Sequence, residues 1–94
     1  MPVRVQRGES TFVAQLKSLS RLGALLEAGE ALAVGTPLEI VLELPGTVEE
    51  TLVRGEVVRV TPAEGLYGLA IFFAPLAPVT LARIESFVAL HSPD

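Results

Sequence analysis

The chain of 94 residues is long enough for one domain, and its 50% hydrophobic and 19% charged residues exclude an intrinsically disordered chain. The absence of cysteine excludes a disulfide framework, a thiol nucleophile and a thiolate metal site. No apolar run reaches the ~20 residues of a transmembrane helix. No apolar stretch follows the first charged residues, as it would in a secretory signal. We therefore expect a single cytoplasmic domain over residues 1–94.

Three short strands are expected in the first third of the chain. Gly and Pro turn signals recur at short intervals between apolar runs, which is typical of a small β-sandwich or β-barrel. In the second run, Phe12, Ala14 and Leu16 fall on one face of a strand. Gln15 and Lys17 fall on the other face, so this strand is expected to be half-buried. The predicted strands are 2–8, 11–19 and 22–28.

Three further strands are expected over residues 37–44, 51–61 and 66–73. The first of these has the clearest alternation, with one apolar face made of Leu38, Ile40, Leu42 and Leu44. In the second, Gly55 predicts a bulge or a close approach of another backbone. The third is apolar at every position from Tyr67 to Phe73, which predicts a strand covered on both faces.

A helix is expected over residues 78–90, because the apolar period changes there from two to about 3.6. Pro78 occupies the first helical position, where proline is favoured. Arg83, Glu85 and Ser86 fall on the face away from the apolar stripe. The stripe needs a sheet to cover it, so the helix is expected to pack on the strands. Its members are Leu81, Ile84, Phe87, Val88 and Leu90.

Residues that carry chemistry are scarce, with one His, one Tyr, one Lys, one Asp and no Trp. We therefore expect no enzyme, no catalytic residue, no metal site and no cofactor. The charge is uneven, since residues 1–23 carry a balance of +3 and the remainder −7. An acidic chain is a poor binder of DNA or RNA, whereas the basic quarter suits a small anion or an acidic patch on a partner.

Four segments, in order along the chain, together carry a family resemblance. They are residues 18–26 (SLSRLGALL), 34–40 (VGTPLEI), 52–59 (LVRGEVVR) and 67–73 (YGLAIFF). The first is similar to a [D/N]-x-S-x-x-G turn that leads into a strand, and the others resemble Gly-containing strand entries and strands of the same family. The chain thus resembles the PilZ domain family. The resemblance implies a mainly β fold, a six-stranded antiparallel barrel with a C-terminal helix.

The same resemblance implies cyclic diguanylate as a possible ligand. In the family, an R-x-x-x-R arm before the first strand binds this dinucleotide together with the [D/N]-x-S-x-x-G turn. Arginine suits the task because its planar guanidinium pairs with phosphate or guanine and stacks on a purine. The candidate ligand-binding residues carried over to this chain are Arg4, Arg7, Ser18, Ser20, Arg21 and Gly23.

The chain departs from the family pattern at two places. Ser18 stands where the family has Asp or Asn, so the side chain is shorter and uncharged. No arm is recognisable, because Arg4 and Arg7 are spaced R-x-x-R within the first expected strand. Residues three apart in a strand lie on opposite faces, so these two arginines are not expected to clamp one ligand.

Three functions follow from this pattern. The first is a non-catalytic PilZ-like adaptor of cyclic di-GMP signalling and type IV pilus or motility control, which binds a protein partner. The second is a genuine cyclic di-GMP receptor that uses the N-terminal arginines and the S-x-S-x-x-G turn. The third is a small barrel that binds oligonucleotides, for which the acidic charge is unfavourable. The missing arm favours the adaptor. We expect no insertion into a membrane, and the sequence leaves the oligomeric state open.

Overall fold

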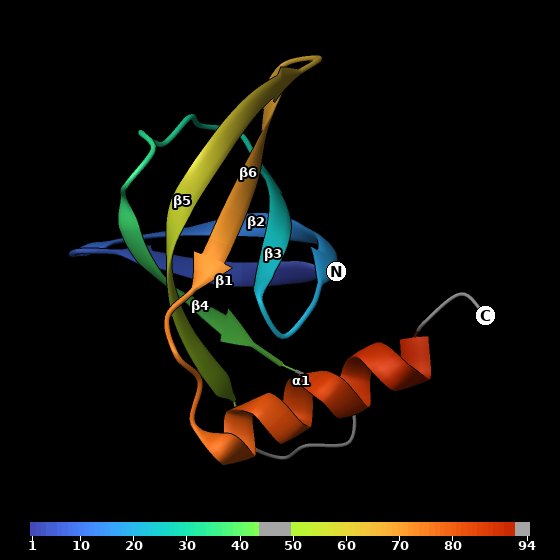
Figure 1. Cartoon of the computed structure of the whole chain (residues 1–94). Coiled ribbons are helices and arrows are strands. Elements are labelled where there is room, and N and C mark those ends of the chain that lie inside the picture. Colours follow the sequence, from blue (N-terminus) through green and yellow to red (C-terminus); the bar gives the residue numbers. More distant parts are fainter. Residues whose placement is uncertain (44–49, 92–94) are drawn as a thin grey trace.

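The computed structural model describes residues 1–43 and 50–91, in which six strands and one C-terminal helix account for most positions (Figure 1). The strands are β1 (Pro2–Arg7), β2 (Ser10–Leu19), β3 (Gly23–Ala28), β4 (Pro37–Leu42), β5 (Thr51–Ala63) and β6 (Leu66–Phe73), and the helix is α1 (Pro78–His91). β5 runs to Ala63, beyond the expected end at 61, because it joins β6 through a two-residue turn. Leu44, expected at the end of β4, lies outside the described residues.

The six strands form one closed antiparallel barrel in the order β1-β2-β3-β6-β5-β4. Consecutive strands pair as hairpins, except that β3 pairs with β6 and β1 closes the barrel by pairing with β4. Arg4 lies opposite Val41 across the closing seam, and Gln6 lies opposite Glu39. The predicted fold class, a six-stranded antiparallel barrel with a C-terminal helix, is confirmed.

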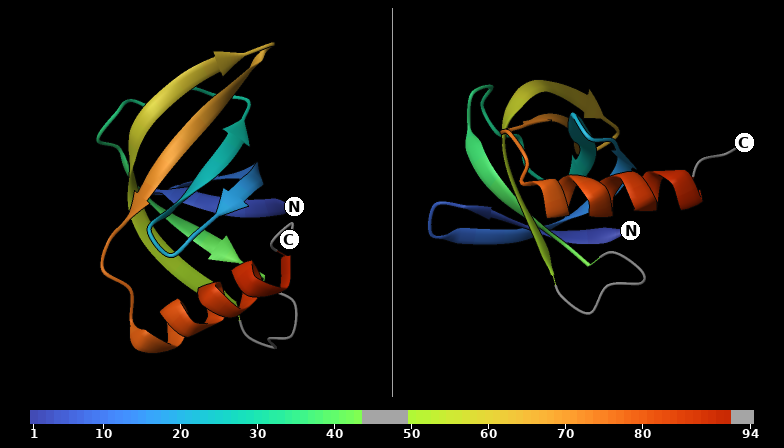
Figure 2. Two further views of the ribbon diagram at one scale, coloured as in Figure 1. Left: turned by 45° about the vertical axis from the view of Figure 1, so that its right-hand side comes forward. Right: turned by 60° about the horizontal axis from the view of Figure 1, so that its bottom comes forward.

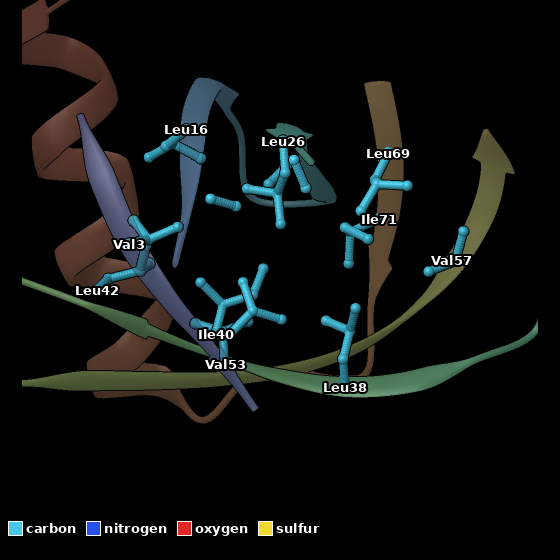
Figure 3. Close-up of a cluster of buried hydrophobic side chains, with 14 of the residues drawn as sticks. Val3, Leu16, Leu26, Leu38, Ile40, Leu42, Val53, Val57, Leu69 and Ile71 are labelled. Atoms are coloured by element: carbon cyan, nitrogen blue, oxygen red, sulfur yellow. The ribbon is translucent and has the colours of Figure 1, made fainter. Parts of the chain in front are cut away.

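The barrel interior holds the hydrophobic core (Figure 3). Every second residue of each strand points inward, as the period of two predicts. The expected inward face of β4 is confirmed for Leu38, Ile40 and Leu42, all of which are buried. The side chains that Figure 3 labels come from all six strands and meet in one cluster: Val3, Leu16, Leu26, Leu38, Ile40, Leu42, Val53, Val57, Leu69 and Ile71.

Helix α1 lies across one end of the barrel (Figures 1 and 2). Ile84 is completely buried among the core residues, and Phe87 and Val88 are partly buried against them. The expectation that Arg83 lies on the face of α1 away from the barrel is wrong. Its guanidinium is part-buried and its Nη1 donates a hydrogen bond to Thr51 Oγ1 at 3.5 Å. The long arginine stem can cover apolar surface at the barrel end while its head reaches this buried hydroxyl.

The outer face of β6 is not covered by the helix, contrary to the expectation from its apolar sequence. Leu69, Ile71 and Phe73 point into the barrel, whereas the side chain of Phe72 points outward and is 53% exposed. A helix that closes the end of a barrel cannot also lie on the outside of its wall. The second apolar face of β6 therefore remains at the surface.

Gly55 allows the neighbouring strand β6 to approach closely, and it does not form the bulge of β5. A Cβ atom at Gly55 would lie 2.6 Å from the carbonyl oxygen of Phe72 on the neighbouring strand. The bulge of β5 falls a few residues later, where the pairing with β6 shifts between Val57 and Arg59. The extra residue is Val58, which a bulge leaves unpaired.

Candidate functional site

The turn between β2 and β3 is organised by Ser20. The Ser20 backbone N–H donates a hydrogen bond to the Gly23 carbonyl at 2.9 Å. The Ser20 Oγ accepts hydrogen bonds from the backbone N–H groups of Leu22 and Gly23, at 3.2 and 3.3 Å. This is the local side-chain to backbone bonding that serine provides in turns. The hydroxyl expected to contact a ligand is therefore engaged in holding the turn.

Gly23 is required by packing of β3 on β6. Gly23 lies opposite Phe72, and a Cβ atom at Gly23 would overlap the carbonyl oxygen of Ile71. The Phe73 N–H donates to the Leu22 carbonyl at 2.9 Å and fixes the turn to the end of β6. Glycine at this position thus has a structural reason that does not depend on a ligand.

Ser18 and Arg21 complete the group of candidate residues at this turn. Ser18 is exposed near the end of β2, opposite Leu25 and directly after the register shift of that strand. The Arg21 side chain is 66% exposed, and its Nη1 lies 4.0 Å from Oε2 of Glu85 on α1. The structure therefore brings together four of the six candidates: Ser18, Ser20, Arg21 and Gly23.

The other two candidates, Arg4 and Arg7, lie on β1 away from the turn. Arg4 pairs with Val13 and Arg7 pairs with Ser10 on the neighbouring strand β2. With a rise of about 3.3 Å per strand residue, Val13 lies about 15 Å from Ser18 and Ser10 about 25 Å. One small ligand at the Ser20 turn cannot contact both arginines over such spans.

The two arginines also differ in orientation, as predicted from their spacing. Arg4 lies on the outer face of β1, between the inward-pointing Val3 and Val5, whereas Arg7 is half-buried at the end of the inward face. The Arg4 guanidinium forms an ion pair with Glu50, which takes up part of its charge. An R-x-x-R spacing in a regular strand therefore does not form a clamp here.

Two surface grooves share one wall, and the smaller of them borders the Ser20 turn. The larger, of about 770 Å³, lies along β4 and β5 and includes Glu39, Arg54 and Glu56. The smaller, of about 350 Å³, lies between the β2–β3 turn and the start of α1. Its lining is mostly apolar, with one charged member: Arg21, Leu22, Phe72, Phe73, Ala74, Pro75, Leu76 and Leu81. Residues 72–75 separate the two grooves.

Phe72 is the surface residue that sequence reasoning misplaced. Its apolar neighbours indicated a core or helix-facing position, yet the side chain stands exposed between the two grooves. The alternation along the strand could have placed Phe72 on the outer face, because Leu69, Ile71 and Phe73 already form the inward face. Tyr67 and Phe73 lie on that inward face, so the three aromatic residues of β6 do not form one platform for stacking bases.

Within residues 1–43 and 50–91, no group of three or more acidic or histidine side chains is placed to hold a metal ion. In the same described part of the chain, no helix has the length and apolar character needed to cross a bilayer.

Comparison with known proteins identifies the fold. The model of the PilZ domain matches residues 1–90, which include the whole barrel and nearly all of α1. The chain belongs to the PilZ domain family. The resemblance carried by the four sequence segments is thus confirmed. No curated protein matches the chain.

Two solved structures show the same PilZ fold. The chain is similar to the Bacillus subtilis inhibitor of motility (MotI/DgrA), with a TM-score of 0.75 and 16% identity, covering 99% of this chain and 48% of that one. It is also similar to the PilZ domain of CeSA from a cellulose-synthesizing bacterium, with a TM-score of 0.67, 24% identity and coverage of 95% and 90%. This PilZ chain spans about half the length of the motility inhibitor.

Proposed function

We propose that this PilZ domain is a non-catalytic regulatory adaptor that acts by binding a protein partner in cyclic di-GMP signalling and type IV pilus or motility control. The observation that carries the proposal is the separation of Arg4 and Arg7 from the Ser20 turn along β1 and β2. PilZ domains are in general regulatory and not catalytic, and the similarity to an inhibitor of motility agrees with such a role.

The separation of the arginines weakens the case for direct nucleotide binding. A hydrogen bond to a charged group contributes about 1.5–3 kcal/mol, so the loss of two such arginine contacts costs about 3–6 kcal/mol. Every 1.4 kcal/mol is a tenfold change, so this loss moves a micromolar dissociation constant to the order of millimolar. Arg21 remains beside the turn, but one cation is a poor match for a ligand with two phosphates.

Calorimetric titration with cyclic di-GMP tests the proposal against the receptor alternative. For the adaptor we expect no saturable heat at ligand concentrations up to about 100 μM, a range in which a micromolar receptor saturates. A dissociation constant below about 10 μM that is lost in both Ser20→Ala and Arg21→Ala would establish the receptor. Arg59→Ala, on the exterior of β5, is the matched control and should behave as the wild-type chain.

The partner is sought by in-cell cross-linking of a tagged chain, followed by affinity capture and mass spectrometry. A component of the pilus or motility machinery is expected in the captured fraction. Recovery of chaperones alone, with no such component, contradicts the adaptor role.

A further inference from the structure

Two hairpins of the barrel extend beyond the strands next to them. β5 pairs with β6 as far as Ala63, but its pairing with β4 ends at Glu56. β2 pairs with β1 from Ser10 onwards, but with β3 only from Gln15. In the right-hand view of Figure 2, the β1–β2 hairpin projects from the barrel at the left. Among the residues that the structure describes, each hairpin therefore has an edge whose backbone N–H and C=O groups lack a neighbouring strand.

The free edge of β5 is blocked. Ala63 and Leu66 pair across the two-residue turn, so every second residue back from Ala63 bonds to β6. Between them, Val60 and Pro62 face the open side, and proline has no N–H to donate. The bulge at Val58 lies directly before this stretch. Proline and bulges are features that keep strand edges from pairing, so this edge is a poor template for an added strand.

The free edge of β2 carries no such block. The Leu16 N–H donates to the Met1 carbonyl at 2.7 Å, so the even-numbered residues of the regular stretch from position 10 to 16 bond to β1. Thr11 and Val13 therefore present their N–H and C=O groups to the open side. Residues 10–14 (STFVA) contain no proline, no charged residue and no shift of register. This edge is open to pairing.

We propose that Thr11 and Val13 bind an extended segment of the partner protein, which adds to the barrel as a strand beside β2. The proposal rests on the proposed adaptor role, and it names the part of the chain that the partner contacts. The N–H and C=O groups of both residues form four hydrogen bonds with the backbone of the segment. The segment continues the line of β3, which ends at Ala28. Strand addition to a free sheet edge is a common mode of peptide recognition.

The spacing of the free groups specifies an extended backbone as the occupant. Thr11 and Val13 are two residues apart, so their bonding groups repeat after about 6.8 Å along one line. An extended chain presents its own N–H and C=O groups at this repeat, whereas a helix uses these groups internally. Residues 10–14 are also rich in the β-branched and aromatic types that pack well between strands.

The neighbouring side chains specify an uncharged segment. Val13 is 64% exposed and lies opposite Arg4, whose charge is already engaged in an ion pair. Thr11 lies opposite the uncharged Gln6. A β-branched residue of the segment packs against Thr11 or Val13 as a cross-strand pair, whereas a charged residue finds no free opposite charge in these two rows. Phe12 lies between them and packs on the core, so an apolar residue suits the middle position of the segment.

A second copy of the chain fits this edge poorly. β3 accompanies β2 as far as Ala28, which lies level with Ala14. A two-fold that sets Thr11 against Thr11 of the second copy also sets Gly8 of one copy level with Ala14 of the other, where Ala28 already stands. Pairing Thr11 with Val13 of the second copy increases this overlap. An extended segment of another protein has no hairpin turn at this place and avoids the clash.

NMR titration of the ¹⁵N-labelled chain with an uncharged probe peptide, acetyl-Gly-Ser-Thr-Val-Thr-Ser-Gly-amide, tests the proposal. The amide signals of Thr11 and Val13 should shift at peptide concentrations up to about 5 mM, a range that saturates a millimolar site, and their hydrogen exchange should slow. The amide signal of Val60, on the blocked edge, should not move. Unchanged Thr11 and Val13 signals overturn the proposal.

Val13→Pro should bind the probe at least tenfold more weakly, because the substitution removes an N–H that faces the open side. The fold should tolerate it, since this N–H is not bonded to β1. Val13→Thr is the matched control, which keeps both the N–H and the branched side chain and should bind as the wild type. Equal binding by Val13→Pro and Val13→Thr contradicts the proposal.

A modified probe separates backbone pairing from apolar adhesion without any change to the protein. The same peptide methylated on the backbone nitrogens of its two Thr residues keeps the side chains but loses the N–H groups that an added strand donates. It should bind the wild-type chain at least tenfold more weakly than the unmodified peptide. Equal affinity of the two peptides overturns strand addition.

The same variants connect the edge to the adaptor role in cells. The pilus or motility component captured by the wild type should be retained by Val13→Thr and lost by Val13→Pro. Capture that is unaffected by Val13→Pro overturns the edge as the docking site and leaves the adaptor role standing. If no such component is captured by any variant, the adaptor role fails, whereas the peptide titration still decides whether the edge accepts a strand.

Discussion

Ile84→Ala examines whether α1 is an integral part of the barrel. Ile84 is completely buried where the helix closes the barrel end, and it is the most buried side chain of α1 within the described residues. Truncation of a buried isoleucine to alanine costs about 2–5 kcal/mol, because contacts are lost and a cavity remains. A chain of this length has a stability of about 5–14 kcal/mol, so the variant is expected to fold with a reduced margin.

Thermal and urea denaturation followed by circular dichroism measure the effect of Ile84→Ala. A loss of about 3 kcal/mol corresponds to a fall in Tm of about 12–24 °C for a domain of this size. Hydrogen exchange of the helix amides should accelerate as well, because Ile84 anchors the helix to the core.

Val79→Ala is the matched control for this prediction. Val79 is also a β-branched residue of α1, but it is 59% exposed, so its truncation should change the stability by less than about 0.5 kcal/mol. Melting temperatures of the two variants within 3 °C of each other would show that the helix does not close the barrel, and the account of the fold would fail at that point.

Gly23→Ala is expected to destabilise the chain by about 3 kcal/mol or more, because the added methyl group overlaps the Ile71 carbonyl oxygen. Gly29→Ala, which has open space around it, should be close to neutral in the same urea titration, and equal effects would refute the packing argument. Glu64→Asn is expected to raise the stability by about 0.5–1 kcal/mol, since Glu64 has a φ of 47° in the two-residue turn between β5 and β6, a conformation that asparagine tolerates better. Glu30→Asn is the control outside this turn, and no gain in Tm for Glu64→Asn relative to it would count against the reasoning.

Local patterns predicted the strands and the helix because their evidence is contained in short stretches of chain. The alternation of Leu38, Ile40 and Leu42 specifies a half-buried strand whatever its neighbours are, and the change of period at Pro78 specifies a helix. The glycine of the S-x-S-x-x-G segment likewise falls where β3 begins. These features gave the family resemblance, and the family was confirmed.

The candidate site depended on information that is not local. Arg4 lies opposite Val13 in the β1–β2 hairpin, and β2 continues beyond Val13 to Leu19 before the turn at Ser20, so the register of the hairpin leaves Arg4 away from the turn. The separation follows from strand register, which requires knowledge of both partners in each pair. Sequence alone predicted only that Arg4 and Arg7 point to opposite faces.

The amino-acid sequence by itself determined which residues face inward and where the elements begin, because side-chain period and turn chemistry act over a few residues. Only the tertiary structure decided that α1 closes the barrel end and leaves Phe72 exposed between two grooves. An apolar strand face looks the same in sequence whether a helix, a second molecule or solvent lies against it. The packing of the whole chain makes that choice, because the apolar residues of α1 meet the core at the barrel end, where Ile84 is completely buried.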